Sequence, residues 1–108
     1  MLLIKYRDGR PDYANGFCGQ ATLRDFWWPL AERLSLPTLQ RLEILSITEL
    51  AEAQQLVAEL RLVEAGLRSP DQLGVPDWAP YILATLDRLL PVLETTLTEW
   101  EQVEYISL

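Results

Sequence analysis

The chain of 108 residues contains no histidine and only one cysteine, Cys18. Because histidine is the commonest general base and a leading zinc ligand, its absence excludes Ser-His-Asp and Cys-His catalytic arrangements and zinc sites that need imidazole. A single thiol forms no disulfide within the chain, and free cysteine usually packs as a small hydrophobic residue. Carboxylates remain as possible acid and base residues or as hard-metal ligands, but they occur singly along the predicted helices, without an Asp-rich calcium-binding loop. We therefore expect no enzymatic activity, no catalytic residues, no metal and no cofactor.

Long apolar runs and phosphate-binding glycine motifs are also missing. A membrane-spanning helix needs about 20 apolar residues, and a secretory signal needs a basic start before an apolar stretch. The longest apolar runs here are short, such as Met1 to Ile4. The spacing of Gly9, Gly16 and Gly19 matches neither a P-loop nor a dinucleotide-binding fingerprint. These absences predict a cytoplasmic protein that binds no membrane.

Basic residues are scarce, because nine Lys and Arg stand against sixteen Asp and Glu and give a formal net charge of −7. This charge repels nucleic-acid phosphates and attracts basic surfaces, although moderate negative charge also serves solubility alone. We therefore expect no nucleic acid as a partner. Hydrophobic residues at 49% and charged residues at 23% are typical of a folded protein, and the length predicts a single domain over residues 1–108.

Short strands are predicted at both termini. Met1 to Tyr6 is apolar and is followed by turn-forming residues at Asp8 and Gly9, and Val103 to Leu108 has the same apolar character. An isolated pair of strands is stable only when it packs on helices. The two terminal segments can therefore pair and close a helical domain with a small sheet.

The first helix is predicted from about Leu23 to Leu34, with Thr22 as its cap through Asp25. Pro29 lies inside this segment. A proline beyond the first turn removes a hydrogen bond and clashes with the preceding turn. The helix is therefore expected either to begin near Phe26 or to be kinked.

The segment from Leu39 to Ile47 fits neither the helical nor the strand period alone, and we expect a helix that frays into an extended piece at Ile44 to Ile47. Ser46 and Glu49 have the spacing of a capping box. Apolar residues then recur at helical spacing from Leu50 to Leu67, which predicts a long helix that ends before the Ser-Pro pair that follows.

The last helix is predicted to follow Asp77 as its cap, with Pro80 in its first turn and a bend at Pro91. Its buried stripe is expected to consist of Trp78, Ile82, Leu86, Leu89, Leu93, Leu97 and Trp100. The predicted fold class is therefore α+β and predominantly α, with three or four helices and a small sheet formed by the N- and C-terminal strands.

Two acidic stripes are expected when the helices are wound at about 3.6 residues per turn. The stripe on the last helix consists of residues spaced seven apart, namely Asp87, Glu94 and Glu101. The stripe on the preceding helix consists of Glu52, Gln55 and Glu59. Arg61 and Arg68 fall on the opposite polar edge of that helix, so the carboxylates are expected to be segregated. We predict the acidic side chains of both stripes as partner-binding residues.

The C-terminal segment has no basic residue after Leu89, whereas it contains four glutamates: Glu94, Glu99, Glu101 and Glu104. Like charges on one face disfavour a helix, and negative charge is also unfavourable near a helix C-terminus. A protein partner with a basic surface would compensate this charge and would associate faster because of it. Alternatively, packing of Trp100 and its neighbours dominates, and the charge has no role.

Trp28 is the second candidate contact. Adjacent residues on a helix point about 100° apart, so Trp27 and Trp28 cannot both lie at the centre of a narrow buried stripe. If Phe26, Trp27, Leu30 and Leu34 face inward, Trp28 lies toward the edge, where tryptophan is a frequent interface anchor. Otherwise Trp28 simply covers the core.

The block DFWWPLAERL at residues 25–34 and the ending EWEQVEYISL at residues 99–108 have the character of family-specific sequence. In size, acidity, absence of catalytic residues and compact helical build, the chain resembles the small immunity proteins that bacteria use to neutralise toxins delivered by contact-dependent or secretion systems. The resemblance implies an acidic, hydrophobic-edged surface that plugs the active site of a basic cytosolic toxin. Under this hypothesis the acidic stripes meet Lys or Arg of the toxin domain, and Trp28 is a desolvated anchor.

Two other classes of protein stay open. A structural or adaptor subunit would use an exposed terminal strand or a helical apolar edge to build a homodimer or a larger complex. A small-molecule-binding domain would use its tryptophans as the walls of a pocket. A homodimer in the absence of any partner would favour the first class, and quenching of tryptophan fluorescence by a metabolite would favour the second.

Overall fold

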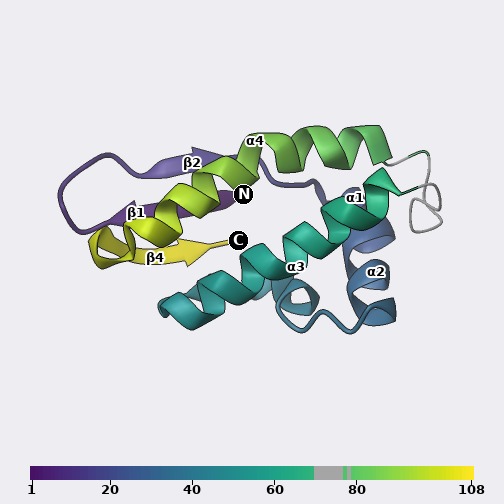
Figure 1. The fold of residues 1–108 in the computed structure, drawn as a ribbon, viewed down its shortest axis with the longest axis horizontal. Coiled ribbons are helices and arrows are strands. Elements are labelled where there is room, and N and C mark those ends of the chain that lie inside the picture. The colour runs from purple at the N-terminus through teal and green to yellow at the C-terminus, as the bar shows by residue number, and fades with distance from the viewer. Residues whose placement is uncertain (70–76, 78) are drawn as a thin grey trace.

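The computed structural model describes residues 1–69, 77 and 79–108, and it has the predicted α+β architecture with predominant helix (Figure 1). Its sheet is antiparallel and has the order β2-β1-β4-β3. The strands are β1 (Leu2–Tyr6), β2 (Tyr13–Asn15), β3 (Ser46–Ile47) and β4 (Val103–Ser107). The predicted pairing of the two terminal segments is confirmed, because β1 and β4 lie side by side with Ile4 opposite Ile106.

The terminal strands occupy the middle of the sheet, so the expectation that one of them offers an exposed edge to a second copy is wrong. The edges are β2 and β3, which are three and two residues long. A strand as short as β2 shows no alternation in the sequence, and it was not predicted. It exists because Gly9, with a φ of 87°, allows the chain to reverse after β1.

The first helical segment is continuous but changes its geometry just before Pro29. It consists of α1 (Gln20–Thr22), the π-helical turn η1 (Leu23–Trp27) and α2 (Trp28–Arg33). The predicted cap at Thr22 is wrong, because Thr22 has helical backbone angles and its side chain makes no capping hydrogen bond. In the widened turn the N–H of Trp28 donates to the carbonyl of Leu23. This turn absorbs the irregularity that Pro29 requires in the first turn of α2.

The end of α2 is closed by a residue in the left-handed region. Ser35 has a φ of 56°, and its N–H donates to the carbonyl of Glu32 at 3.3 Å. The N–H of Leu36 donates to the carbonyl of Ala31 at 2.8 Å, which completes a Schellman motif. The chain then forms the 3-10 helix η2 (Leu39–Ile44) before β3, so the predicted change from helix to extended chain is confirmed.

The two long helices are α3 (Leu50–Arg68) and α4 (Ala79–Thr98), followed by the short 3-10 helix η4 (Trp100–Gln102). The predicted capping box is wrong, because Ser46 lies in β3 and the N-cap residue Glu49 makes no side-chain capping hydrogen bond. The sequence between the two long helices also predicts a loop from Ser69 to Pro76, of which residues 70–76 lie outside the described residues, as does Trp78, the expected first residue of the last helix. Pro91 lies inside α4, which continues on both sides of it.

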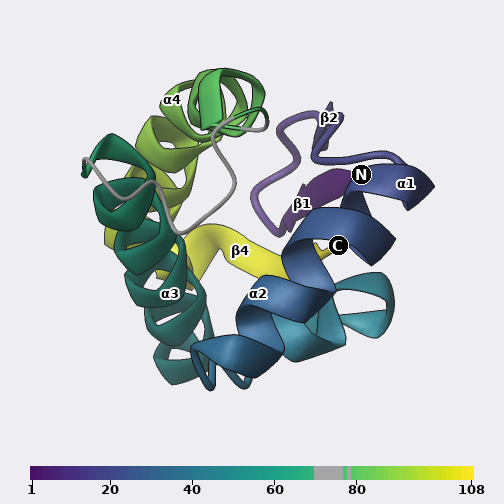
Figure 2. The same ribbon diagram turned by 90° about the vertical axis from the view of Figure 1, so that its right-hand side faces the viewer.

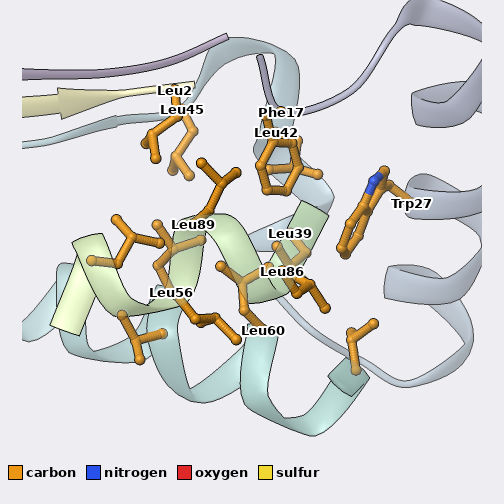
Figure 3. Packing of buried hydrophobic residues seen from close by; sticks show 14 of the residues in the cluster. Leu2, Phe17, Trp27, Leu39, Leu42, Leu45, Leu56, Leu60, Leu86 and Leu89 are labelled. Atoms are coloured by element: carbon orange, nitrogen blue, oxygen red, sulfur yellow. The ribbon is translucent and has the colours of Figure 1, made fainter. Parts of the chain in front are cut away.

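The core lies where α3 and α4 pack against the sheet and the first helical segment. Figure 2 shows α3 and α4 along one side of the molecule and α1 and α2 along the other, with strands between them. Leu56 and Leu60 of α3 point toward Leu86 and Leu89 of α4 (Figure 3). Trp27 joins the same buried cluster from the first helical segment. Across the described residues, no helix combines the length and the apolar character that crossing a membrane requires.

The predicted inward-facing stripes are largely confirmed. The buried members of the last-helix stripe are Ile82, Leu86, Leu89 and Leu93, whereas Leu97 and Trp100 are half-buried. In the first helical segment the buried members are Phe26, Trp27 and Leu30. Leu34 is exposed instead, because α2 ends at Arg33 and the chain turns away before Ser35.

Candidate functional site

Asp87 and Glu94 lie on an exposed side of α4, but each is paired with an arginine of α3. Arg68 Nη2 donates to Asp87 Oδ1 at 2.8 Å, and Arg61 donates to Glu94 through both Nη2 and Nε, the latter at 2.9 Å. Glu64 accepts from Arg61 at 2.8 Å and lies 3.7 Å from Arg68. Hydrogen bonds from Arg61, first to Glu94 and then to Glu64, raise its pKa. The expected segregation of these arginines from the carboxylates is therefore wrong.

These ion pairs neutralise charge locally but contribute little to the stability of the fold. The side chains of the Arg61–Glu94 and Arg68–Asp87 pairs are 43 to 57% exposed, and exposed pairs contribute only about 0–1 kcal/mol each. Two arginines and three carboxylates together leave this side of the molecule with little unbalanced charge. Asp87 and Glu94 are therefore less available to a basic partner than the sequence indicates.

Glu59 is not on the surface at all, which corrects its placement in an exposed acidic stripe. It is 1% exposed, and its carboxylate accepts hydrogen bonds from the backbone N–H groups of Thr38 at 3.0 and 3.2 Å and of Leu39 at 3.0 Å. Gln55 Nε2 donates to the same carboxylate at 2.8 Å. Thr38 is the N-cap residue of η2. Glu59 therefore caps a helix distant in sequence, and it cannot meet a partner in this structure.

Glu52 and Trp28 are accessible but lie apart. Glu52 is half-buried in the first turn of α3, with its carboxylate 4.0 Å from Arg41. Trp28 is partly exposed in a hollow of about 320 Å³ beside Glu32 and Gln40, and its buried Nε1 has no acceptor among the described residues. Figure 1 places α2 toward one end of the molecule and the segment between α4 and β4 at the other. The predicted site residues therefore do not form one surface.

Three carboxylates at that second end have no cation in an ion pair within the described part of the chain: Glu49, Glu101 and Glu104. All three are exposed, and we call them the acidic end. Arg7 lies beside Glu104 in a surface hollow, but its Nε donates to the carbonyl of Val103 at 2.9 Å. Of the carboxylates predicted to bind a partner, Glu101 alone belongs to this group.

Glu101 of the acidic end lines a hollow of about 450 Å³, which we call the Trp100 hollow. It is lined by Leu50 at the start of α3, by residues 97–99 at the end of α4, and by Trp100, Glu101 and Gln102 of η4. Glu99 is already engaged, because its Oε2 accepts from Arg10 Nη1 at 2.7 Å. Glu101 is therefore the free carboxylate on the rim of a partly apolar depression. The sequence signal that could have found this hollow is the EWE tripeptide at residues 99–101, which belongs to the predicted last helix although α4 ends at Thr98.

Cys18 lies in a different place, a cavity of about 300 Å³ whose lining includes Phe17, Leu23, Leu42 and the terminal residue Leu108. Burial raises the pKa of its thiol, opposed only in part by the N-terminal ammonium group. A raised thiol pKa lowers the thiolate fraction and therefore the nucleophilicity. No tryptophan lines this cavity. Within the described residues, no three Cys, Asp or Glu side chains gather closely enough to hold a metal ion.

Comparison with known proteins adds no functional assignment. No family model matches the chain, and neither a curated protein nor a solved structure matches it. What the surface can do chemically therefore follows from its own side chains. An exposed carboxylate that has no ion pair within the described part of the chain, such as Glu101 next to the half-buried indole of Trp100, is suited to bind a cationic group.

Proposed function

We propose that this chain is a non-catalytic, protein-binding domain whose partner presents a basic surface to the acidic end. The observation that supports the proposal is a contrast in charge pairing. Asp87, Glu94 and Glu99 each bind an arginine of the chain itself, whereas the three carboxylates of the acidic end have no such cation among the described residues. A partner's Lys and Arg side chains would supply the missing cations.

The position of the acidic end makes this compensation favourable. Glu101 follows the C-terminus of α4, where the helix dipole already carries partial negative charge. A carboxylate at this place is repelled by the partial negative charge of the helix end. A cation is attracted by the helix end and by the carboxylate. Opposite charge also steers association, so a basic partner would bind faster than a neutral one.

Within this class we propose an inhibitor of the immunity type, which neutralises a bacterial toxin that carries a basic surface. The acidic composition, the small single fold and the unpaired carboxylates of the acidic end fit a protein that acts by covering a basic site. Glu52, near the start of α3, would extend the contact. Trp28 lies toward the other end of a molecule 42 Å long, so it would contribute only if the partner spans both ends.

The experiment is co-expression of the chain with the products of the genes that flank its own. We expect one product to inhibit growth, to be neutralised by the chain, and to co-elute with it in size-exclusion chromatography. Turnover of a substrate by the purified chain, or neutralisation without complex formation, would contradict the proposal.

The role of the acidic end is tested with two matched variants that each remove one negative charge. Glu101→Gln is expected to weaken the complex by about five-fold and to reduce its salt dependence, because it removes an uncompensated charge. Glu94→Gln is expected to change the affinity less than about two-fold, because Arg61 already neutralises that carboxylate. Equal effects of the two variants would refute the special role of the acidic end.

A further inference from the structure

The Trp100 hollow combines three features that each favour a cation with an apolar stem. Leu50, Leu97 and the half-buried Trp100 supply an apolar and aromatic wall. Glu101 supplies an exposed carboxylate with no cation in an ion pair among the described residues. The end of α4 supplies the third feature, because the hollow is lined by residues of its last turn.

The helix end offers acceptors as well as a dipole. The backbone N–H of Glu99 donates to the carbonyls of Thr95 and Thr96, both at 3.2 Å, and closes that part of the last turn. No backbone N–H of the described residues donates to the carbonyls of Leu97 and Thr98. The last carbonyls of a helix are acceptors for a basic side chain placed near the C-terminus.

We infer that the Trp100 hollow receives one protruding arginine side chain of a protein partner. The inference rests on the proposed function and names the group that the acidic end recognises. The methylene stem of the arginine would pack on Leu97, and its guanidinium plane would stack on Trp100. The same guanidinium would donate to Glu101 and to the free carbonyl oxygens at the end of α4, which its five donors and planar shape allow.

Charge complementarity selects this occupant over an apolar one. A purely apolar side chain would bury Glu101 and the helix carbonyls without a donor, and unpaired buried acceptors are costly. An acidic side chain would be repelled by Glu101 and by the helix end. The chain's own Arg10 does not fill the role, because it is held by Asp8 at 2.6 Å and by Glu99 at 2.7 Å.

The test uses the full chain and a capped tripeptide, acetyl-Gly-Arg-Gly-amide, with the citrulline peptide as its uncharged isostere. Binding is followed by the amide and indole N–H resonances in two-dimensional NMR spectra. We expect saturable shifts centred on Trp100 and Glu101, and at least about five-fold weaker binding of the citrulline peptide. Glu101→Gln should weaken arginine-peptide binding about five-fold, whereas Glu94→Gln should leave it unchanged.

Trp100→Ala tests the stacking, and Trp100→Phe keeps the site falsifiable if the alanine variant does not fold. The phenylalanine variant should bind about two- to three-fold more weakly than the wild type, because tryptophan offers the better cation-binding face. Arginine-specific shifts confined to Glu49 and Glu104 would refute arginine binding in the Trp100 hollow, but they would still support binding of a basic partner to the acidic end. Equal shifts with both peptides at all positions would refute both arginine binding in the Trp100 hollow and the proposed electrostatic recognition of a basic partner.

Discussion

The buried carboxylate of Glu59 gives the sharpest prediction about stability. Glu59→Ala removes the acceptor of two backbone N–H groups whose residues, Thr38 and Leu39, are themselves buried. Each unsatisfied buried donor costs about 1–3 kcal/mol. The variant no longer buries a charged carboxylate, and this gain offsets part of the cost of the two unsatisfied donors. We expect a net loss of about 3 kcal/mol in the free energy of unfolding. For a domain near 100 residues this lowers Tm by about 12–24 °C.

Glu59→Gln separates hydrogen bonding from charge. A single oxygen, Oε1, accepts from both Thr38 and Leu39 at 3.0 Å, so a glutamine oxygen in that place would keep both bonds. The glutamine NH2 then takes the place of Oε2, and Gln55 keeps its hydrogen bond by turning its own amide so that the oxygen accepts. The expected loss is then only about 1 kcal/mol, the difference between a charged and a neutral acceptor. Urea unfolding followed by tryptophan fluorescence and circular dichroism measures both variants.

The control is Glu94→Ala, which removes an exposed and paired carboxylate and should cost less than about 1 kcal/mol. A loss below about 1 kcal/mol for Glu59→Ala would refute the capping role. Equal losses for the alanine and glutamine variants would show that charge, and not the acceptor geometry, is what η2 requires.

Four further predictions follow from the local environment of single side chains and pairs. Ser35→Gly should stabilise the fold by about 0.5–1 kcal/mol in urea unfolding, because Ser35 holds a left-handed φ of 56°; a loss would contradict this. Burial raises the pKa of Cys18, so iodoacetamide at pH 8 should react more slowly with the native than with the unfolded chain. Stability should also fall as pH rises above the ordinary thiol pKa, since the unfolded chain loses its proton first, and Cys18→Ala should remove this slope. A double-mutant cycle on Arg61 and Glu94 should give less than about 1 kcal/mol of coupling, decreasing with salt.

Periodicity was sufficient to predict the long elements of this fold. Apolar spacing placed α3 and the buried face of α4, and the apolar termini predicted the β1–β4 pair, because each pattern extends over enough residues to be distinctive. Caps were predicted less well, since Thr22 and Ser46 have side chains that suit a cap while tertiary packing sets the helix starts elsewhere. Local propensity is overridden wherever neighbouring elements fix the chain.

The carboxylates could not be sorted from the sequence, because their state depends on which element lies beside them. Glu59 and Glu52 are seven residues apart on α3, yet Glu59 faces the N-terminus of η2 and is buried, while Glu52 stays accessible. Asp87 and Glu94 meet arginines that are 19 and 33 residues away along the chain. Helical winding predicts which residues share an edge, but only the packing of two helices determines whether opposite edges meet.

The distribution of charge decides how a partner would approach. Ion pairs reduce the charge of the α3–α4 side, while the acidic end keeps carboxylates without a cation among the described residues. Charges in water are screened beyond about 8–10 Å at ordinary salt, which is far less than the 42 Å length of the molecule. A basic surface approaching the far end would therefore gain little from the net charge of −7, whereas one approaching Glu101 would gain from its carboxylate and from the end of α4 together. Orientation in the complex is thus set by where carboxylates have no ion pair among the described residues, since the arginines near the acidic end are held by the carbonyl of Val103 and by Asp8 and Glu99.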